Sequence, residues 1–298
     1  MKILLIGGSG QLGGALKNLI GNKNELFLPN SKDLDISHQE SVNNFLDNWL
    51  PEIVVNCAAY TNVDEAEIDQ DKSYKVNTLG PSYLSLKTNE LNSLLIHIST
   101  DYVFGGKGVG PFSSNDITSP VNYYGYTKDM GEKMVFKNTD KYILIRTSSL
   151  MSAKEGNFTS KIYSKLVNKE KIRMIENQNI TMTCANNLAS FINILIMNYQ
   201  SLVDGGLCKD KVIHFTNLGY TNWFSIASRV QERLINEKII KNNNFIEPIS
   251  SEDWKSKALR PSDSRLSINL DLLEKLNVEP IRWEESLDKI VNELILKQ

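Results

Sequence analysis

The sequence predicts an α/β fold, a Rossmann-type doubly wound parallel sheet with a smaller C-terminal α/β substrate domain. Three observations predict it. Short apolar runs alternate with helix-length amphipathic stretches through the first half of the chain, which is typical of βαβ units. The runs are continuously apolar, as expected of strands that are buried on both faces. A glycine-rich turn follows the first run directly and opens the first helix.

The first half contains five predicted strands, at residues 2–6, 26–28, 53–55, 94–98 and 142–145. Apolar residues with helical spacing predict the first helix over 12–20. Ser37 and Glu40 form a capping-box pattern, which predicts that the second helix starts there and runs toward Leu50. A long amphipathic stretch from about 66 to 91 and the segment after Asn122 predict two further helices.

The second half is less regular. Runs at 172–175 and 212–215 predict two more strands, and the segments 186–199, 223–239 and 284–296 predict helices. We expect a dinucleotide-binding domain over 1–150 and a substrate domain over 151–298. The boundary stays open, because a strand and a helix from about 172 to 200 can rejoin the first sheet.

Composition excludes several classes of protein. Lys plus Arg is 33 and Asp plus Glu is 35, so the formal charge of −2 disfavours a general phosphate surface, and no nucleic-acid partner is expected. No apolar run approaches the roughly 20 residues of a membrane-spanning helix, so we expect a cytoplasmic protein without a membrane partner. The widely spaced Cys57, Cys184 and Cys208 form neither a disulfide framework nor a CxxC motif, and the scattered histidines make a metal site unexpected.

The glycine-rich turn GGSGQLG places Gly7, Gly10 and Gly13 with GxxGxxG spacing, not the GxGxxG of the common dinucleotide fingerprint. Glycine permits a tight turn and lets a pyrophosphate approach the backbone, and the helix N-terminus attracts the anion. The placement between a strand and a helix predicts a dinucleotide phosphate site. A tight turn that binds nothing is the alternative.

The segment after the second strand predicts the choice of cofactor. An acidic residue there would bind both ribose hydroxyls of NAD, but the chain has Asn30, Ser31 and Lys32 instead. A hydroxyl and an ammonium can hold a 2′-phosphate, so we predict NADPH, with NADH as the open alternative and a solvated loop lysine as the alternative for Lys32. Asp35 and Ile36, which follow, suit the adenine edge.

A phenol is a useful acid near neutral pH only if its ionised form is stabilised, since free Tyr titrates near ~10. A lysine one helical turn away does this. The chain has two such pairs, Tyr83–Lys87 and Tyr124–Lys128. We interpret the first as packing and solvent contact. The second opens the helix after the STDYVF loop, where Thr100 ends the fourth strand at the ligand-binding edge of the sheet.

Five segments, GGSGQLGG, NCAAYTNVDEAE, STDYVF, YYGYTKDMGEK and RPSDSRL, together resemble the extended short-chain dehydrogenase/reductase superfamily. Within it the chain is most similar to the dTDP-4-dehydrorhamnose reductase family, in collinear order from residue 2 to about 266. The resemblance implies NADPH-dependent reduction of the C4 ketone of a 6-deoxy-4-keto nucleotide sugar. The alternatives are another nucleotide-sugar epimerase or reductase on the same fold, and a non-catalytic NADP-binding regulatory subunit. The sequence leaves the oligomeric state open, a homodimer included.

The resemblance also implies site residues. Tyr124 would donate the proton, Lys128 would hold the nicotinamide ribose and lower the pKa of Tyr124, and Thr100 would be the third catalytic hydroxyl. The cofactor would contact Gly7, Ser9, Gly10, Gln11, Leu12 and Gly13 with its pyrophosphate, and Cys57, Ala58, Ala59 and Tyr60 on the path to the nicotinamide ribose. The substrate would contact Thr100, Asp101, Tyr124, Asn157, Phe158 and Arg260, with a structural ion pair as the alternative for Arg260.

Three positions depart from patterns of related enzymes. Tyr102 stands where nucleotide-sugar dehydratases of the superfamily carry a catalytic Glu, so ketone reduction is the expected reaction. Ser149 stands where the family commonly has a Trp that can stack on the sugar, so the sugar itself is left open. Gly14 and Ala15 replace a Glu that binds a divalent metal in some members, so no metal is predicted.

Overall fold

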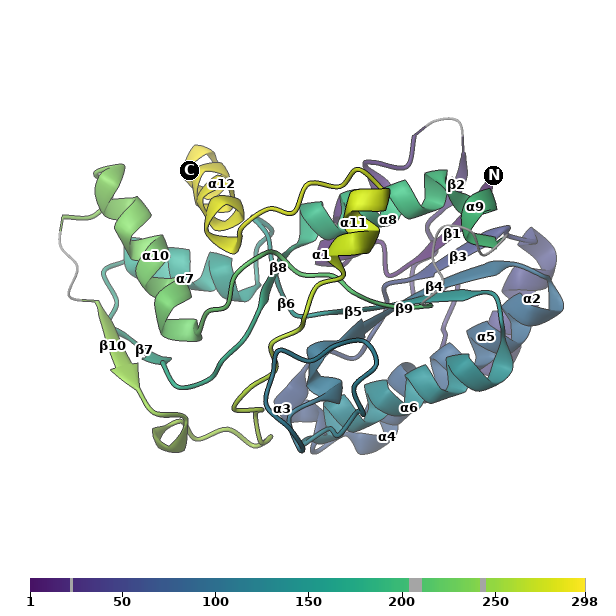
Figure 1. Cartoon of the computed structure of the whole chain (residues 1–298), viewed down its shortest axis with the longest axis horizontal. Coiled ribbons are helices and arrows are strands. Elements are labelled where there is room, and N and C mark those ends of the chain that lie inside the picture. Colours follow the sequence, from purple (N-terminus) through teal and green to yellow (C-terminus); the bar gives the residue numbers. More distant parts are fainter. Residues whose placement is uncertain (22–23, 204–210, 242–244, 298) are drawn as a thin grey trace.

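The centre of the structure is a six-stranded parallel sheet with helices on both faces (Figure 1). This computed structural model describes residues 1–21, 24–203, 211–241 and 245–297. In spatial order the strands are β2 (Glu25–Phe27), β1 (Lys2–Ile6), β3 (Ile53–Asn56), β4 (Leu94–Thr100), β5 (Tyr142–Thr147) and β9 (Val212–His214). The strand order reverses between β1 and β3, which is where open α/β sheets bind ligands.

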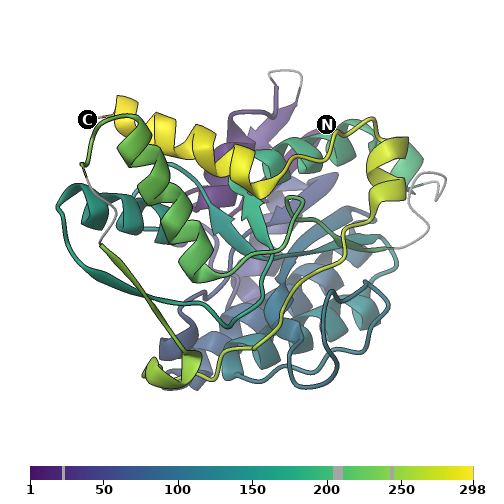
Figure 2. The same ribbon diagram turned by 60° about the vertical axis from the view of Figure 1, so that its left-hand side comes forward.

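A separate layer of helices covers each face of the sheet (Figure 2). One face packs against α1 (Gln11–Lys17), α8 (Ala185–Met197) and α11 (Leu270–Lys275), and the short α9 (Tyr199–Val203) follows α8. The other face packs against α2 (Gln39–Trp49), α5 (Gly80–Glu90) and α6 (Tyr123–Asn138). Consecutive residues of β1, such as Leu4 and Leu5, point to opposite faces of the sheet, and both are fully buried because both faces are covered.

The segment between β3 and α5 is divided into three short elements, α3 (Val63–Ala66), α4 (Gln70–Tyr74) and a π-helical turn over Lys75–Leu79. The sequence predicts a single helix here, and the caps explain the difference. The Asn62 and Asp69 side chains accept hydrogen bonds from the backbone N–H groups three residues later, so each starts a helix of its own.

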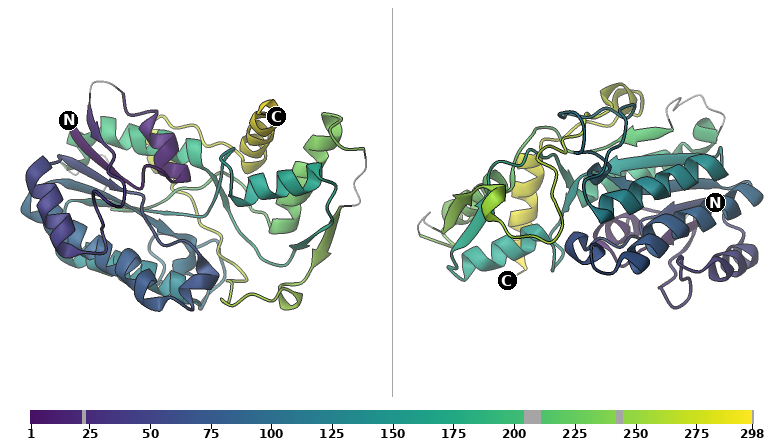
Figure 3. Two further views of the ribbon diagram at one scale, coloured as in Figure 1. Left: turned by 180° about the vertical axis from the view of Figure 1, so that it is seen from behind. Right: turned by 90° about the horizontal axis from the view of Figure 1, so that it is seen from below.

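A smaller lobe follows β5 along the chain (Figure 3). Its helices are α7 (Phe158–Val167), α10 (Trp223–Asn236) and α12 (Trp283–Leu296). They share one apolar core with two parallel strand pairs, β6 (Ser149–Met151) with β8 (Met182–Cys184) and β7 (Ile172–Ile175) with β10 (Ile246–Ile249). The amino terminus lies in the sheet lobe and the carboxyl terminus in the smaller lobe (Figure 3).

The predicted Rossmann-type α/β fold is confirmed, and all five strands of the first half lie in one parallel sheet. The later strands behave differently from each other. β7 pairs with β10 and does not rejoin this sheet, whereas β9 joins its edge and α8 packs on its face. The division into two domains near residue 150 stays a prediction. In the structure, β9 and α8 lie after residue 150 in the chain but pack with the sheet of the first half.

The predicted capping box at the start of α2 is wrong. The helix begins at Gln39, and its N-cap residue His38 makes no side-chain cap. The Ser37 hydroxyl instead donates to Asp35 Oδ1 at 2.7 Å, and the Ser37 backbone N–H donates to the same oxygen. Because Asp35 takes the hydroxyl, Ser37 belongs to the preceding turn.

Candidate active site

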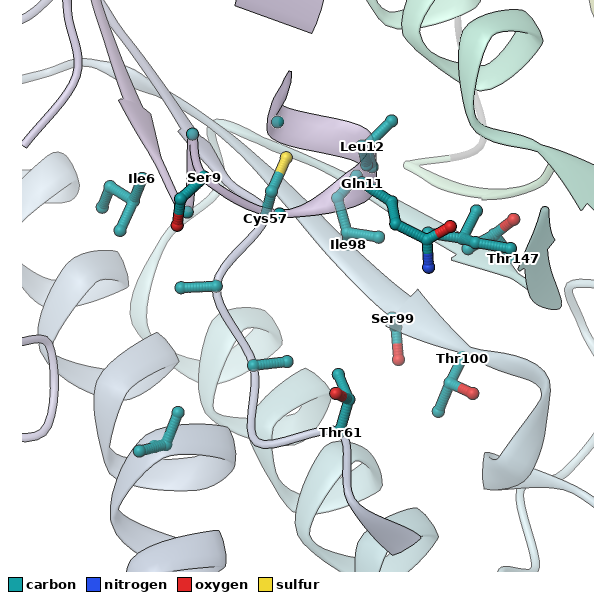
Figure 4. A pocket seen from close by; sticks show the side chains of 18 of the residues that line it. Ile6, Ser9, Gln11, Leu12, Cys57, Thr61, Ile98, Ser99, Thr100 and Thr147 are labelled. Atoms are coloured by element: carbon teal, nitrogen blue, oxygen red, sulfur yellow. The ribbon is translucent and has the colours of Figure 1, made fainter. Parts of the chain in front are cut away.

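A cavity of about 1080 Å³ lies at the carboxyl ends of β1, β3, β4 and β5. Figure 4 shows side chains from these four places around one space, among them Ser9 and Gln11, Thr61, Ser99 and Thr100, and Thr147. The volume is slightly above the range for sites that hold one drug-sized ligand, so the cavity has room for a large ligand such as a dinucleotide. Its place at the strand-order reversal agrees with the ligand edge predicted from the sequence.

The glycine-rich loop between β1 and α1 forms one wall of the cavity. Gly7 has a φ of +80°, and a Cβ there would lie 2.8 Å from the backbone nitrogen of Ala58. A Cβ at Gly13 would lie 2.3 Å from the carbonyl oxygen of Gly7. Larger residues at either position would push the loop apart, so glycine is required for the tight turn. Ser9, Gly10, Gln11 and Leu12 line the cavity between them.

The segment after β2 brings Asn30, Ser31, Asp35 and Ile36 to the cavity. The Asn30 side chain shapes this segment, since its Oδ1 accepts the backbone N–H of Lys32 at 2.8 Å and its amide donates to Asp33 Oδ2. The Lys32 side chain is exposed and is not among the residues that line the cavity.

Two buried asparagines hold the loop after β3. Asn56 Oδ1 accepts the backbone N–H of Ala58 at 3.1 Å. Asn77, in the π-helical turn, accepts the backbone N–H of Tyr60 at 2.9 Å and donates to its carbonyl at 3.0 Å. Cys57, Ala58 and Ala59 line the cavity as a result, whereas Tyr60 lies outside the lining. Sequence reasoning missed Asn77, because a π-turn inside a helix leaves no regular pattern, although such turns often occur at functional sites.

Tyr124 and Lys128, one turn apart on α6, both face the cavity at the end of β4, next to Thr100. Asn122 caps α6 by accepting the backbone N–H of Gly125 at 2.8 Å, which starts the helix just before the two side chains. The Lys128 ammonium donates to the carbonyl of Ile98 at 2.7 Å. The three residues predicted as a proton-donating group are therefore brought together.

Burial controls the ionisation of this group. Desolvation raises the pKa of the Tyr124 phenol, and a hydrogen bond with the Thr100 side chain opposes the rise. This net direction is opposite to the lowering expected from Lys128. Desolvation lowers the pKa of Lys128 to about 8, against the charge of Glu132. Desolvation also raises the pKa of the Cys57 thiol to about 12, so this cysteine is not a nucleophile near neutral pH.

Asp101 is a buried carboxylate beside Thr100. The Thr100 hydroxyl donates to Asp101 Oδ1 at 3.1 Å, and the Ser264 hydroxyl donates to Oδ2 at 2.6 Å. Desolvation raises the pKa of Asp101 to about 6, and these hydrogen bonds limit the rise. Ser264 comes from the RPSDSRL segment, so a residue far along the chain holds the end of β4.

A buried ion pair joins α6 to the sheet. Arg146 on β5 donates to Glu132 through Nη2 at 2.7 Å and through Nε at 3.0 Å, and Ser99 donates to the same carboxylate at 2.5 Å. The two charged side chains are 4% and 1% exposed. Glu132 lies one turn after Lys128, so the pair fixes the part of α6 that presents the lysine.

The second tyrosine–lysine pair lies elsewhere. Lys87 on α5 forms ion pairs with Asp47 at 2.7 Å and with Glu90 at 2.8 Å. Neither Tyr83 nor Lys87 lines the cavity. The interpretation of this pair as packing and surface contact agrees with its place between α2 and α5.

Three residues predicted for the substrate have other partners in this structure. Arg260 pairs with Asp64 at 2.8 Å, and Phe158 packs edge to face on Trp223 with ring centroids 4.7 Å apart. Neither lines the cavity. Asn157 does line it, but its Oδ1 caps α7 by accepting the backbone N–H of Ser160 at 3.0 Å.

Within the described part of the chain, no three His, Cys, Asp or Glu side chains come close enough to hold a metal ion. The absence of a metal stays a prediction. Cys57 and Cys184 are free thiols, and Cys208 lies outside the described residues. Among the described helices, none is both long and apolar enough to cross a bilayer.

Comparison with known proteins finds relatives along the whole chain. The family model described as "RmlD substrate binding domain" matches residues 1–296. The dTDP-4-dehydrorhamnose reductase of Escherichia coli is 31% identical over 299 residues, which cover 99% of this chain and 98% of that protein. The spore coat polysaccharide biosynthesis protein SpsK of Bacillus subtilis is 30% identical over 293 residues, which cover 98% and 97%.

Solved structures agree with these relatives. A dTDP-4-dehydrorhamnose reductase from Bacillus anthracis in complex with NADP superposes with a TM-score of 0.85 at 28% identity, covering 98% of this chain and 99% of that one. A dTDP-4-dehydrorhamnose reductase ortholog from Clostridium acetobutylicum superposes with a TM-score of 0.87 at 30% identity, covering both chains completely. The similarity therefore extends over both lobes.

Proposed function

The chain belongs to the RmlD substrate binding domain family, and from this we infer that it is an NADPH-dependent oxidoreductase. It reduces the C4 ketone of a 6-deoxy-4-keto nucleotide sugar, as the name of its dTDP-4-dehydrorhamnose reductase relatives indicates, and serves deoxysugar biosynthesis. The observation that carries the proposal is the meeting of Tyr124, Lys128 and Thr100 in one cavity with the glycine-rich loop.

The residues present fit a dinucleotide. The glycine-rich loop leaves no room for a Cβ at Gly7 or Gly13, so its backbone is compact and open to a phosphate. The Ile98 carbonyl takes one of the three donors of Lys128, and two more are left for ribose hydroxyls. When bound, the reduced nicotinamide supplies a hydride to the ketone carbon. A structure 28% identical to this chain holds NADP, in agreement with the predicted cofactor.

Tyr124 donates the proton that the ketone oxygen takes up as the carbonyl is reduced. Burial keeps its phenol protonated at neutral pH, which is the state that a proton donor needs. Thr100 stands beside it and helps to place the substrate oxygen. The cation of Lys128 favours the phenolate that is left after the proton has gone.

The substrate oxygen meets a site that is already organised. Asp101 accepts a hydrogen bond from the Thr100 hydroxyl, and the Arg146–Glu132 ion pair holds the part of α6 that carries Lys128. These groups are buried and hydrogen-bonded before a ligand arrives, so little rearrangement is needed as charge develops on the oxygen. Contacts of Arg260 and Phe158 with the nucleotide sugar, and of Lys32 with the 2′-phosphate, are further parts of this proposal.

The test is a panel of 4-keto nucleotide sugars, epimerised and unepimerised, incubated with the protein and NADPH. We expect loss of NADPH absorbance with a 6-deoxy-4-keto sugar and a lower apparent KM for NADPH than for NADH. Equal or better use of NADH would contradict the cofactor choice. Binding of NADPH without its oxidation by any sugar would favour a regulatory subunit instead.

We further propose that the protein works in the cytoplasm, because NADPH and nucleotide sugars are charged molecules that bilayers exclude. A homodimer is part of the same proposal, and sedimentation at several concentrations tests it.

A further inference from the structure

The segment between β6 and α7 reaches across the cavity to the glycine-rich loop. Ser152 Oγ donates to Gln11 Oε1 at 2.6 Å. The Lys154 ammonium donates to the carbonyl oxygen of Ser9, and Lys154 itself lines the cavity. Figure 4 shows the Gln11 side chain extending from the start of α1 into this space. Residues about 140 positions apart in the chain thus meet over the loop.

The segment that carries Lys154 has a defined backbone. The Asn157 amide donates to the carbonyl of Ser152 at 2.9 Å and to that of Lys154 at 2.6 Å. Gly156, with a φ of +83°, allows the chain to turn between Lys154 and Asn157. Because the Asn157 side chain also caps α7, the backbone of Lys154 is tied to that helix, while its long side chain stays exposed.

The glycine-rich loop GGSGQLG carries no positive charge of its own. Three lysines, Lys17, Lys128 and Lys154, are among the described residues that line the cavity. Lys128 lies at the end of β4 on the Ile98 carbonyl. Lys17 ends α1, six residues after Gln11 and so about 9 Å further along the helix axis. Lys154 is the lysine of this set that touches the loop.

We propose that Lys154 binds the diphosphate of the dinucleotide from the far side of the cavity, supplying the positive charge that the glycine-rich loop lacks. The inference rests on the proposed function, which puts the cofactor diphosphate on this loop. An ammonium has three donors, and the Ser9 carbonyl takes one of them, so two can reach phosphate oxygens. The diphosphate of a nucleotide sugar offers the same chemistry, but the contact with Ser9 favours the cofactor.

The test compares Lys154→Gln with Lys161→Gln. Both variants remove one exposed lysine charge, the second from α7, away from the cavity lining. Titration calorimetry measures the Kd for NADPH and for thymidine diphosphate, the latter a probe for the substrate's diphosphate. We expect Lys154→Gln to raise the Kd for NADPH by about 5–20-fold, and less at high salt, because charge-assisted hydrogen bonds are lost. Lys161→Gln should stay within about twofold.

Lys154→Arg keeps the charge and is expected to restore most of the affinity for NADPH. An unchanged Kd for NADPH in Lys154→Gln would overturn the inference, as would a loss confined to thymidine diphosphate. These titrations need no turnover. If Lys154→Gln weakens NADPH binding but the wild type oxidises NADPH with none of the 4-keto sugars, the proposed function alone is contradicted. If the wild type is active but Lys154→Gln and the wild type have equal Kd values for NADPH, the inference alone is contradicted.

Discussion

Tyr124 is the side chain on which the proposed reaction depends most. Its phenol is buried next to Thr100, and desolvation raises the pKa of this phenol, so Tyr124 is protonated in the free protein. The lysine four residues later was expected to lower this pKa. The Lys128 ammonium instead donates to the Ile98 carbonyl, and its own pKa falls to about 8. Its charge matters mainly once the phenol has given up its proton.

Replacing Tyr124 with Phe should lower kcat by about 10²–10⁴-fold, because general acid catalysis contributes about that much. The Kd for NADPH should change by less than about twofold, since the aromatic ring stays in place. Steady-state kinetics and NADPH titration measure the two quantities. Tyr83→Phe is the matched control, as it removes the same hydroxyl from the other tyrosine–lysine pair. Turnover by Tyr124→Phe close to that of the control would rule out the assigned proton donor.

Asp101 makes stability depend on pH. Its pKa in the folded protein, about 6, is above its ordinary value of 3.8, so folding takes up a proton between these pH values. Its contribution to stability is therefore greatest below about pH 4 and is lost as the pH rises through about 6. Urea unfolding at about pH 4 and about pH 7 measures the free energy of unfolding of the wild type and of Asp101→Asn. From about pH 4 to about pH 7, the stability of Asp101→Asn relative to the wild type should increase by about 2–3 kcal/mol. A pH-independent difference would contradict this account of Asp101.

Helix α6 carries both members of the reactive pair, and its position depends on β5. Arg146 and Glu132 are almost completely buried and face each other across the helix–sheet interface. Ser99 on β4 adds a third contact to the same carboxylate. Glu132 thus joins α6 to β4 and β5, one helical turn from Lys128. The stability of α6 and the position of Lys128 in the active site therefore depend on the same contacts.

Glu132→Gln should destabilise the protein by about 3–5 kcal/mol, because it leaves the Arg146 cation buried without its counter-charge. Asp71→Asn is the comparison. It breaks the exposed Lys75–Asp71 pair on the surface and should cost less than about 1 kcal/mol. Chemical denaturation of both variants measures the difference. Equal small effects would mean that the buried pair does not hold α6.

Other elements show what local sequence could not predict. The capping box at Ser37 was wrong because Asp35, two residues earlier, takes the serine hydroxyl. The π-helical turn that aims Asn77 at the loop after β3 has no signal in its own residues, KVNTL. Helix α7 was missed, although Asn157 before an amphipathic stretch is a usable start signal.

For the molecule as a whole, the sheet of the first half was predictable because each buried strand is a local apolar run between glycines, prolines or polar caps. The pairing of β7 with β10 was not, since it joins segments far apart that look alike in composition. The same holds for the site. The loop and the Tyr124–Lys128 pair are local motifs, whereas the contacts of Lys154 with Ser9 and of Ser264 with Asp101 exist only in the folded chain.

The central claim is that one cavity brings a reduced nicotinamide and a sugar ketone together beside Tyr124. The most direct test is to run the reaction with NADPH that carries deuterium at the transferable C4 position, using a 6-deoxy-4-keto nucleotide sugar. Nuclear magnetic resonance of the product then locates the label. We predict deuterium at C4 of the sugar with the wild type, and the same labelled product formed at least about 10²-fold more slowly with Tyr124→Phe. Absence of label at C4 in the wild-type product, or labelled product from both proteins at similar rates, would contradict the account.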